Sequence, residues 1–143
     1  MAGLKKGEVW KLEYIVPIED DSGVERVLGL AREYVQFMGF EGVETTFFVT
    51  SIMEVARNML DRCARGMVGI RAISMESEKR LMFVFSNYWE SKEDVRLRLQ
   101  NDALVSERSP MKFSRKSGMT DEVEIISEIG GRGMIELRIR KRQ

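Results

Sequence analysis

The period of the hydrophobic positions changes several times along the chain, and each change marks a predicted element. Five stretches are typical of strands, because their apolar residues either alternate with polar ones or form a short apolar run bounded by turn residues. These strands are predicted at 11–18, 68–74, 81–86, 122–128 and 134–140. The stretch 81–86 is almost entirely apolar, so we expect a central strand that is covered on both faces.

A first amphipathic helix is predicted directly after the first strand, which ends near Pro17. Proline lacks a backbone N–H, so this strand is expected at a sheet edge. The acidic residues and serine at 19–22 suit a helix start, and apolar residues then recur at intervals of three and four. Gly39 is expected to end the helix, with Phe40 folding back as the hydrophobic contact of the C-terminal cap.

A second helix is predicted at 43–64, with an apolar stripe on one side and Glu54, Arg57 and Asn58 on the other. A third is predicted at 92–100, because the residues before it resemble a capping box, although alternation within the same stretch would also suit a strand. Residues 101–119 are polar and are expected to form a loop, with room for one helical turn.

The predicted order is strand, two long helices, two strands, an irregular region and two strands. This order favours an α+β fold, a two-layer α/β sandwich with a mixed, mostly antiparallel sheet and helices on one face. We expect residues 1–143 to form a single domain with a loose start at 1–8. The basic end of the chain, from Arg138 onward, is interpreted as a solvated edge strand and tail.

Charge and composition exclude several functional classes. The 23 basic and 23 acidic residues balance, whereas a general nucleic-acid-binding protein has a basic excess. No apolar run approaches the roughly 20 residues that span a bilayer, and the N-terminus lacks the apolar stretch of a secretory signal. The single cysteine, Cys63, cannot form an internal disulfide, so we expect a cytoplasmic protein.

The chain contains no histidine. This excludes a Ser-His-Asp or Cys-His centre, a histidine-ligated zinc and a phosphohistidine relay. Lysine, arginine and glutamate are abundant whereas asparagine and glutamine are scarce, a bias that resembles that of thermophilic proteins.

The second predicted helix carries the residues with the most chemical content. Glu54 and Asn58 are four apart, so they lie on one side of the helix with Arg57 beside them. A carboxylate can orient a hydroxyl nucleophile, and an amide oxygen is a hard ligand for Mg²⁺. This spacing is compatible with a shared magnesium–phosphate group, and equally with an ordinary solvated helix face.

Several segments together resemble the histidine-kinase-like ATPases (the GHKL fold), and among them the small anti-sigma-factor serine kinases and stressosome switch kinases. The likeness is carried by Met38-Gly39-Phe40 at the end of the first helix, by Glu54-Val55-Ala56-Arg57-Asn58, and by Asp121-Glu122-Val123-Glu124-Ile125. It covers most of residues 12–141, with a gap at 87–117. The resemblance implies that Glu54 is catalytic, that Arg57 lies by the nucleotide phosphates, and that Asn58 binds the magnesium ion of Mg-ATP.

The chain departs from this family where the nucleotide would be held. The family's Asp-x-Gly-x-Gly box corresponds here to 87–91, where Asn87 is the remaining candidate for contacting the adenine and bulky residues replace the glycines. The second glycine box falls in 104–118, where Lys112 and Arg115 are candidate phosphate-binding cations without a glycine-rich backbone cradle. Residues 87–118 therefore correspond to a divergent lid. The resemblance supports the predicted fold and argues against ATP binding.

Three functions remain open from the sequence. The first is a regulatory protein that binds a protein partner, which would be an antagonist domain or a signalling subunit. We expect no cofactor for this function, and the protein could form a homodimer. The second is an active protein serine kinase that binds Mg-ATP or ADP through Asn58 and Asn87. The third is an unrelated two-layer scaffold in which the Glu54–Asn58 match is a coincidence.

Overall fold

The computed structural model describes residues 8–63, 65–87, 95–96, 99, 111–114, 121–129 and 134–142. Its strands are β1 (Glu8–Ile18), β2 (Gly66–Met75), β3 (Glu78–Asn87), β4 (Met111–Ser114), β5 (Asp121–Ile129) and β6 (Met134–Arg142), and its helices are α1 (Asp21–Phe37) and α2 (Val43–Cys63). The predicted α+β class is confirmed, and the five predicted strands and the two long helices are present with slightly wider or shifted bounds.

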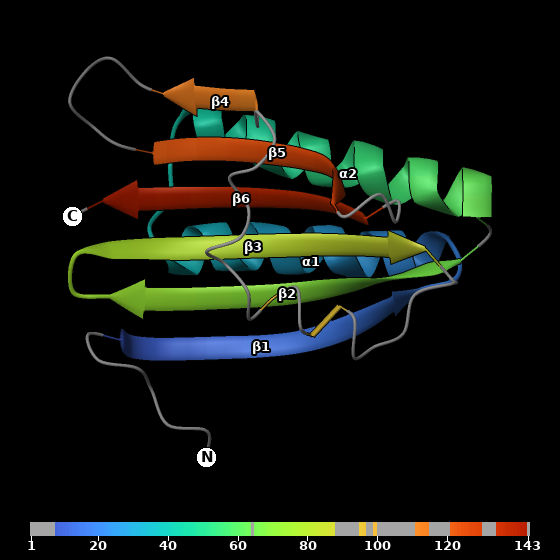
Figure 1. Cartoon of the computed structure of the whole chain (residues 1–143), viewed down its shortest axis with the longest axis horizontal. Helices are drawn as coiled ribbons and strands as arrows, with labels where there is room; N and C mark the ends of the chain where they lie inside the picture. Colours follow the sequence, from blue (N-terminus) through green and yellow to red (C-terminus); the bar gives the residue numbers. More distant parts are fainter. Residues whose placement is uncertain are drawn as a thin grey trace.

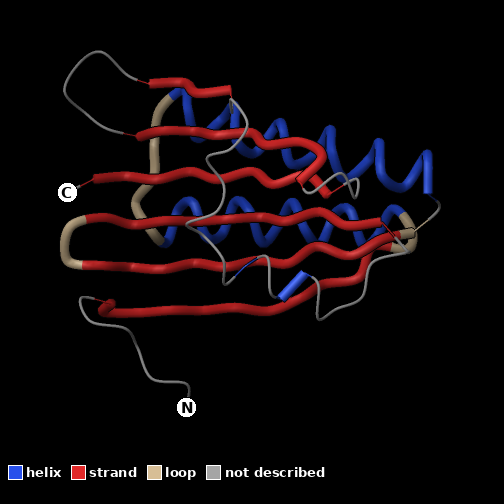
Figure 2. Tube along the Cα trace, viewed as in Figure 1, coloured by secondary structure: helices blue, strands red, loops and turns tan. Residues whose placement is uncertain are grey.

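The strands form one six-stranded sheet with the order β1-β2-β3-β6-β5-β4, as Figure 1 shows. Every pairing among the described strands is antiparallel, so the prediction of a mixed sheet was wrong. Helices α1 and α2 both lie behind the sheet in Figures 1 and 2, on the same face, as the sequence predicted. In the described part of the chain, no helix is both long and apolar enough to cross a bilayer.

Two predictions about the C-terminal half need correction. Residues 111–114 form β4 inside the stretch that the sequence predicted as loop, because a strand of four residues is too short to show a period. Strand β6 is not at an edge: it pairs with β3 on one side and with β5 on the other. The predicted third helix at 92–100 lies mostly outside the described residues, although residues 95, 96 and 99 are helical.

Local signals at the ends of α1 match the prediction. The Asp20 carboxylate accepts hydrogen bonds from the Ser22 hydroxyl at 2.6 Å and the Gly23 N–H at 3.0 Å, and these bonds lower the pKa of that carboxyl. At the other end Gly39 has a φ of 76°, the left-handed conformation that glycine adopts without strain. The Phe40 N–H donates to the Val35 carbonyl at 2.9 Å, and the Phe40 side chain is buried.

The main core lies between the helices and the sheet. Phe48 of α2 packs edge-on against Phe83 of β3, with ring centroids 5.9 Å apart. On the opposite side of the sheet, Met82 and Val84 form a second cluster with Val95 and Leu99. Strand β3 is therefore buried on both faces, as its apolar sequence predicted, and the two helices are not the only cover of the sheet.

Candidate functional site

Helix α2 presents the three residues that the sequence singled out. Its buried side is formed by Phe48, Ile52 and Ala56, which are spaced four apart and have no exposed surface. Glu54, Arg57 and Asn58 lie on the other side and are all exposed to solvent. The structure therefore brings these three side chains to one surface, but it does not enclose them.

Arg57 already has a partner on the neighbouring helix. Its guanidinium lies 3.8 Å from the carboxylate of Glu25 in α1, and the two side chains are 49% and 66% exposed. An exposed ion pair of this kind contributes about 0–1 kcal/mol to stability, because water and salt screen it. The contact matters more for position than for stability, since it holds Arg57 toward α1 and joins the two helices into one polar surface.

The remaining candidate residues belong to other elements. Asn87 is the last residue of β3 and is paired with Gly66 of β2. Lys112 is in β4, where its backbone is paired with Glu124 of β5.

The side chains of Asn87 and Lys112 lie outside the described part of the structure. Their assignment to a nucleotide site stays a prediction. Arg115 and residues 88–91, the divergent glycine box, lie outside the described residues.

The candidate magnesium ligand Asn58 is exposed. Within the described part of the chain, no group of three or more acidic, histidine or cysteine side chains could hold a metal ion. A magnesium site needs oxygen ligands that converge on an octahedron, and a nucleotide site needs an enclosed surface.

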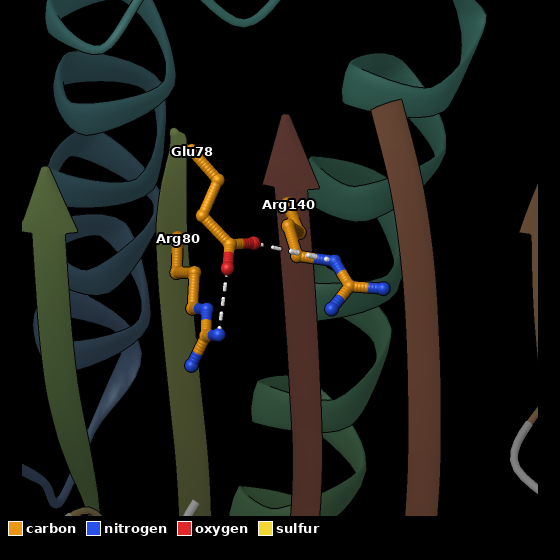
Figure 3. Close-up of polar contacts among 3 residues, drawn as sticks. All are labelled: Glu78, Arg80 and Arg140. Carbon is orange, nitrogen blue, oxygen red and sulfur yellow. Dashed lines mark hydrogen bonds and ion pairs between the residues drawn. The ribbon is translucent and has the colours of Figure 1, made fainter. Parts of the chain in front are cut away.

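A network of charges on the sheet face opposite the helices was not predicted from the sequence. Glu136 of β6 has no exposed surface, and its carboxylate lies 2.8 Å from Nε of Arg138. Figure 3 shows a second contact group, in which the Glu78 carboxylate lies 2.7 Å from Arg80 and 3.6 Å from Arg140. These residues come from β3 and β6, which are adjacent only because β6 is inserted into the middle of the sheet.

In this network the Glu78–Arg140 contact joins neighbouring strands, whereas Glu136–Arg138 and Glu78–Arg80 each lie within one strand. Arg71 of β2 extends it toward the sheet edge: its guanidinium donates to the Leu99 carbonyl and lies 3.9 Å from the Glu13 carboxylate. Alternation of charged and apolar residues along 136–140 was visible in the sequence, but it is equally typical of a solvated strand. Only the strand order distinguishes the two cases.

Comparisons with known proteins leave the geometry as the basis for a functional argument. No protein-family model matches the chain, and no curated protein matches it either.

Proposed function

We propose that this chain is a kinase-like regulatory protein that acts by binding a protein partner and that has lost, or nearly lost, the ability to bind ATP. The partner surface is the exposed side of α1 and α2 around Glu25, Glu54, Arg57 and Asn58, here termed the helix face. The partner is a protein of the kind that the resemblance suggests, an antagonist domain or a signalling subunit.

One observation carries this proposal: Glu54, Arg57 and Asn58 are all on open surface. In a nucleotide-binding protein these residue types would converge on phosphate in a site that excludes water. Their exposure places a carboxylate, a guanidinium and a carboxamide in one solvent-accessible patch. Such groups suit the polar rim of a protein interface, where they give specificity and speed of association more than affinity.

The shape of the patch supports the same reading. Exposed residues continue along α2 at helical spacing, from Thr46 and Thr50 through Glu54 to Asp61. The stripe is uncharged near the start of the helix and charged toward its end. A partner that lies along α2 would therefore meet hydroxyls at one end and mixed charges at the other, which fixes its orientation.

Calorimetry with Mg-ATP and Mg-ADP tests the nucleotide part of the proposal. We expect no binding heat at nucleotide concentrations up to roughly 1 mM, a limit that corresponds to a binding free energy weaker than about −4 kcal/mol. Micromolar binding that disappears in Asn58→Ala would instead establish the active-kinase alternative. In that case Glu54→Gln, which keeps the size of the side chain, should abolish phosphate transfer if Glu54 is the base.

Site-directed photo-crosslinking tests the protein-binding part. A crosslinker at position 58 is expected to capture a discrete partner, and the charge reversal Arg57→Glu is expected to abolish capture without changing the unfolding temperature. A crosslinker at Arg96, which is exposed but not on α1 or α2, is the matched control. Equal capture from both positions, or capture unaffected by Arg57→Glu, would remove the helix face as the binding surface.

A further inference from the structure

Gly29 lies inside helix α1, where a glycine is not expected. Glycine in a helix interior lowers stability relative to alanine, because it loses more conformational freedom on folding. Gly29 is exposed, and a Cβ atom added to it would meet nothing within 4 Å. Positive φ values are found at Gly39 and Gly42, and not at Gly29. Within the described part of the chain, neither packing nor backbone geometry accounts for this glycine.

The position of Gly29 on α1 brings it next to α2. Glu25, one helical turn before Gly29, is in contact with Arg57 of α2. The loop between the two helices spans 38–42, and such a short connection joins helices that run in opposite directions. Counted from the Glu25–Arg57 contact, the next turn of α1, at Gly29, therefore comes beside Met53 of α2.

Residues at helical spacing continue this position into a stripe along both helices. They are Glu25, Gly29 and Arg32 of α1 and Thr50, Met53 and Arg57 of α2, here termed the interhelix stripe. All six are exposed except Met53, which is partly buried. Gly29 therefore leaves the α1 backbone bare in the middle of the stripe, beside a flexible apolar side chain.

We propose that the protein partner docks an amphipathic helix along the interhelix stripe and crosses α1 at Gly29. This inference rests on the proposed function and specifies how the partner is bound. Two helices approach most closely where the side chains between them are smallest, so a bare backbone at the crossing point gives an intimate contact. Met53 adds an adaptable apolar surface beside it, as in other proteins that bind a helix by its apolar face.

The distribution of charge defines the chemistry of the partner helix. Where α1 begins and α2 ends, the exposed charged residues are the acidic residues 19–21 with Glu25, Glu54 and Asp61, and the arginines at 26, 57, 62 and 65. Carboxylates therefore exceed guanidinium groups at this end, six to four.

The opposite end of the stripe has no such excess among its described residues. Arg32 and Glu33 of α1 balance each other there, and α2 presents the hydroxyls of Thr46 and Thr50. We therefore infer that the partner helix carries lysine or arginine at one end and uncharged polar residues at the other. This asymmetry fixes the direction in which it lies.

Substitution of Gly29 separates binding from folding. Gly29→Gln adds a long side chain at the crossing point, yet glutamine is a better helix former than glycine. We expect the unfolding temperature of this variant to equal or exceed that of the parent chain, and its affinity for the partner helix to fall at least about tenfold. The matched control is Arg96→Gln, which puts the same side chain at an exposed position outside α1 and α2 and should change neither quantity.

A displayed library of amphipathic helices, with one face randomised, is the probe for the partner chemistry. Selection on the parent chain is expected to enrich helices with lysine or arginine near one end and glycine, alanine or serine at the centre of the binding face. The most enriched helix, made as a peptide, is then titrated against the parent chain, Gly29→Gln and Arg96→Gln by fluorescence anisotropy. No enrichment, enrichment of acidic helices, or equal affinity for the parent chain and Gly29→Gln would overturn the proposal.

The photo-crosslinker at position 58 distinguishes this inference from the proposed function. Gly29→Gln is expected to abolish capture of the partner, as Arg57→Glu is. Capture that is lost in Arg57→Glu but retained in Gly29→Gln would keep the helix face as the binding surface and would refute the helix crossing at Gly29. Capture that is retained in both variants would refute both proposals.

Discussion

At Gly69 the sheet and the residues that cover its far side come so close that no side chain fits between them. A Cβ atom added to Gly69 would lie 2.5 Å from Cγ1 of Val95 and 2.8 Å from Cδ1 of Leu99. The nearby Arg71 guanidinium donates to the Leu99 carbonyl, so the same segment is fixed to β2 by a polar contact and by a close apolar one. The glycine therefore serves packing, and not a turn.

Two glycine substitutions should have opposite effects on stability. Gly69→Ala is expected to lower the free energy of unfolding by about 1–3 kcal/mol, because Val95 and Leu99 must move away from the added methyl group. Gly29→Ala is the control: it lies inside α1 with nothing within 4 Å of the added atom, so it should raise stability by about 0.5–1 kcal/mol.

Urea denaturation measures both effects as shifts in the midpoint concentration of urea, provided that the dependence of the unfolding free energy on urea concentration is unchanged. A neutral Gly69→Ala would mean that Val95 and Leu99 do not rest on β2 as described.

Single residues were predictable from the sequence where their role is local. The roles of Gly39 and Phe40 at the end of α1 follow from a few neighbouring positions, and the structure confirms them. The role of Gly69 could not be predicted, because it depends on residues that are distant in the sequence and reach the sheet through the tertiary fold.

At the scale of elements, the contrast between α2 and β6 separates two kinds of charge. Arg57 on α2 is in contact with Glu25 in open solvent, whereas Glu136 on β6 is fully buried beside Arg138. Removing one partner from an exposed pair costs little, because water replaces it. Removing one partner from a buried pair leaves a charge that water cannot reach.

The two pairs should therefore respond differently to alanine substitution. Arg57→Ala is expected to change the free energy of unfolding by less than about 1 kcal/mol. Glu136→Ala is expected to lower it by about 1–3 kcal/mol, because the guanidinium of Arg138, which is 21% exposed, loses its fully buried partner.

Thermal and urea unfolding of both variants and of the parent chain give the comparison. Equal small effects would show that Glu136 is reached by water in solution.

The elements with a clear period were predicted well, and those without one were not. Strand β4 has four residues, too few for a pattern, and the predicted helix at 92–100 mixed two periods. The central position of β6 was missed for a different reason: alternation of apolar and charged residues is compatible with both an edge strand and an inner strand whose charges are paired. Strand order is not encoded in the period of one strand.

At the scale of the whole molecule, the α+β class with helices on one face could be predicted from the order of the elements. The surroundings of the candidate site could not be predicted from that order. Sequence reading located Glu54, Arg57 and Asn58 correctly on one side of a helix, because helical spacing is a local property. Whether that side is enclosed depends on segments far along the chain, and α2 leaves it open.

The insertion of β6 between β3 and β5 has a kinetic consequence. Three pairings, β2–β3, β4–β5 and β5–β6, join neighbours in the sequence, whereas the seam between β3 and β6 pairs residues as distant as Glu78 and Arg142. The pairing of β1 with β2 has a similar sequence separation, as at Trp10 and Ser74. Closing a long loop costs more conformational entropy than closing a hairpin, so the seam and the β1–β2 pairing should form after the hairpins during refolding. Pulse-labelling of amide hydrogens would show this order if seam amides gain protection after hairpin amides, and simultaneous protection would refute it. Until β6 pairs with β3, these two strands each leave an extra unpaired edge, so the time before closure is when the chain is most prone to aggregate.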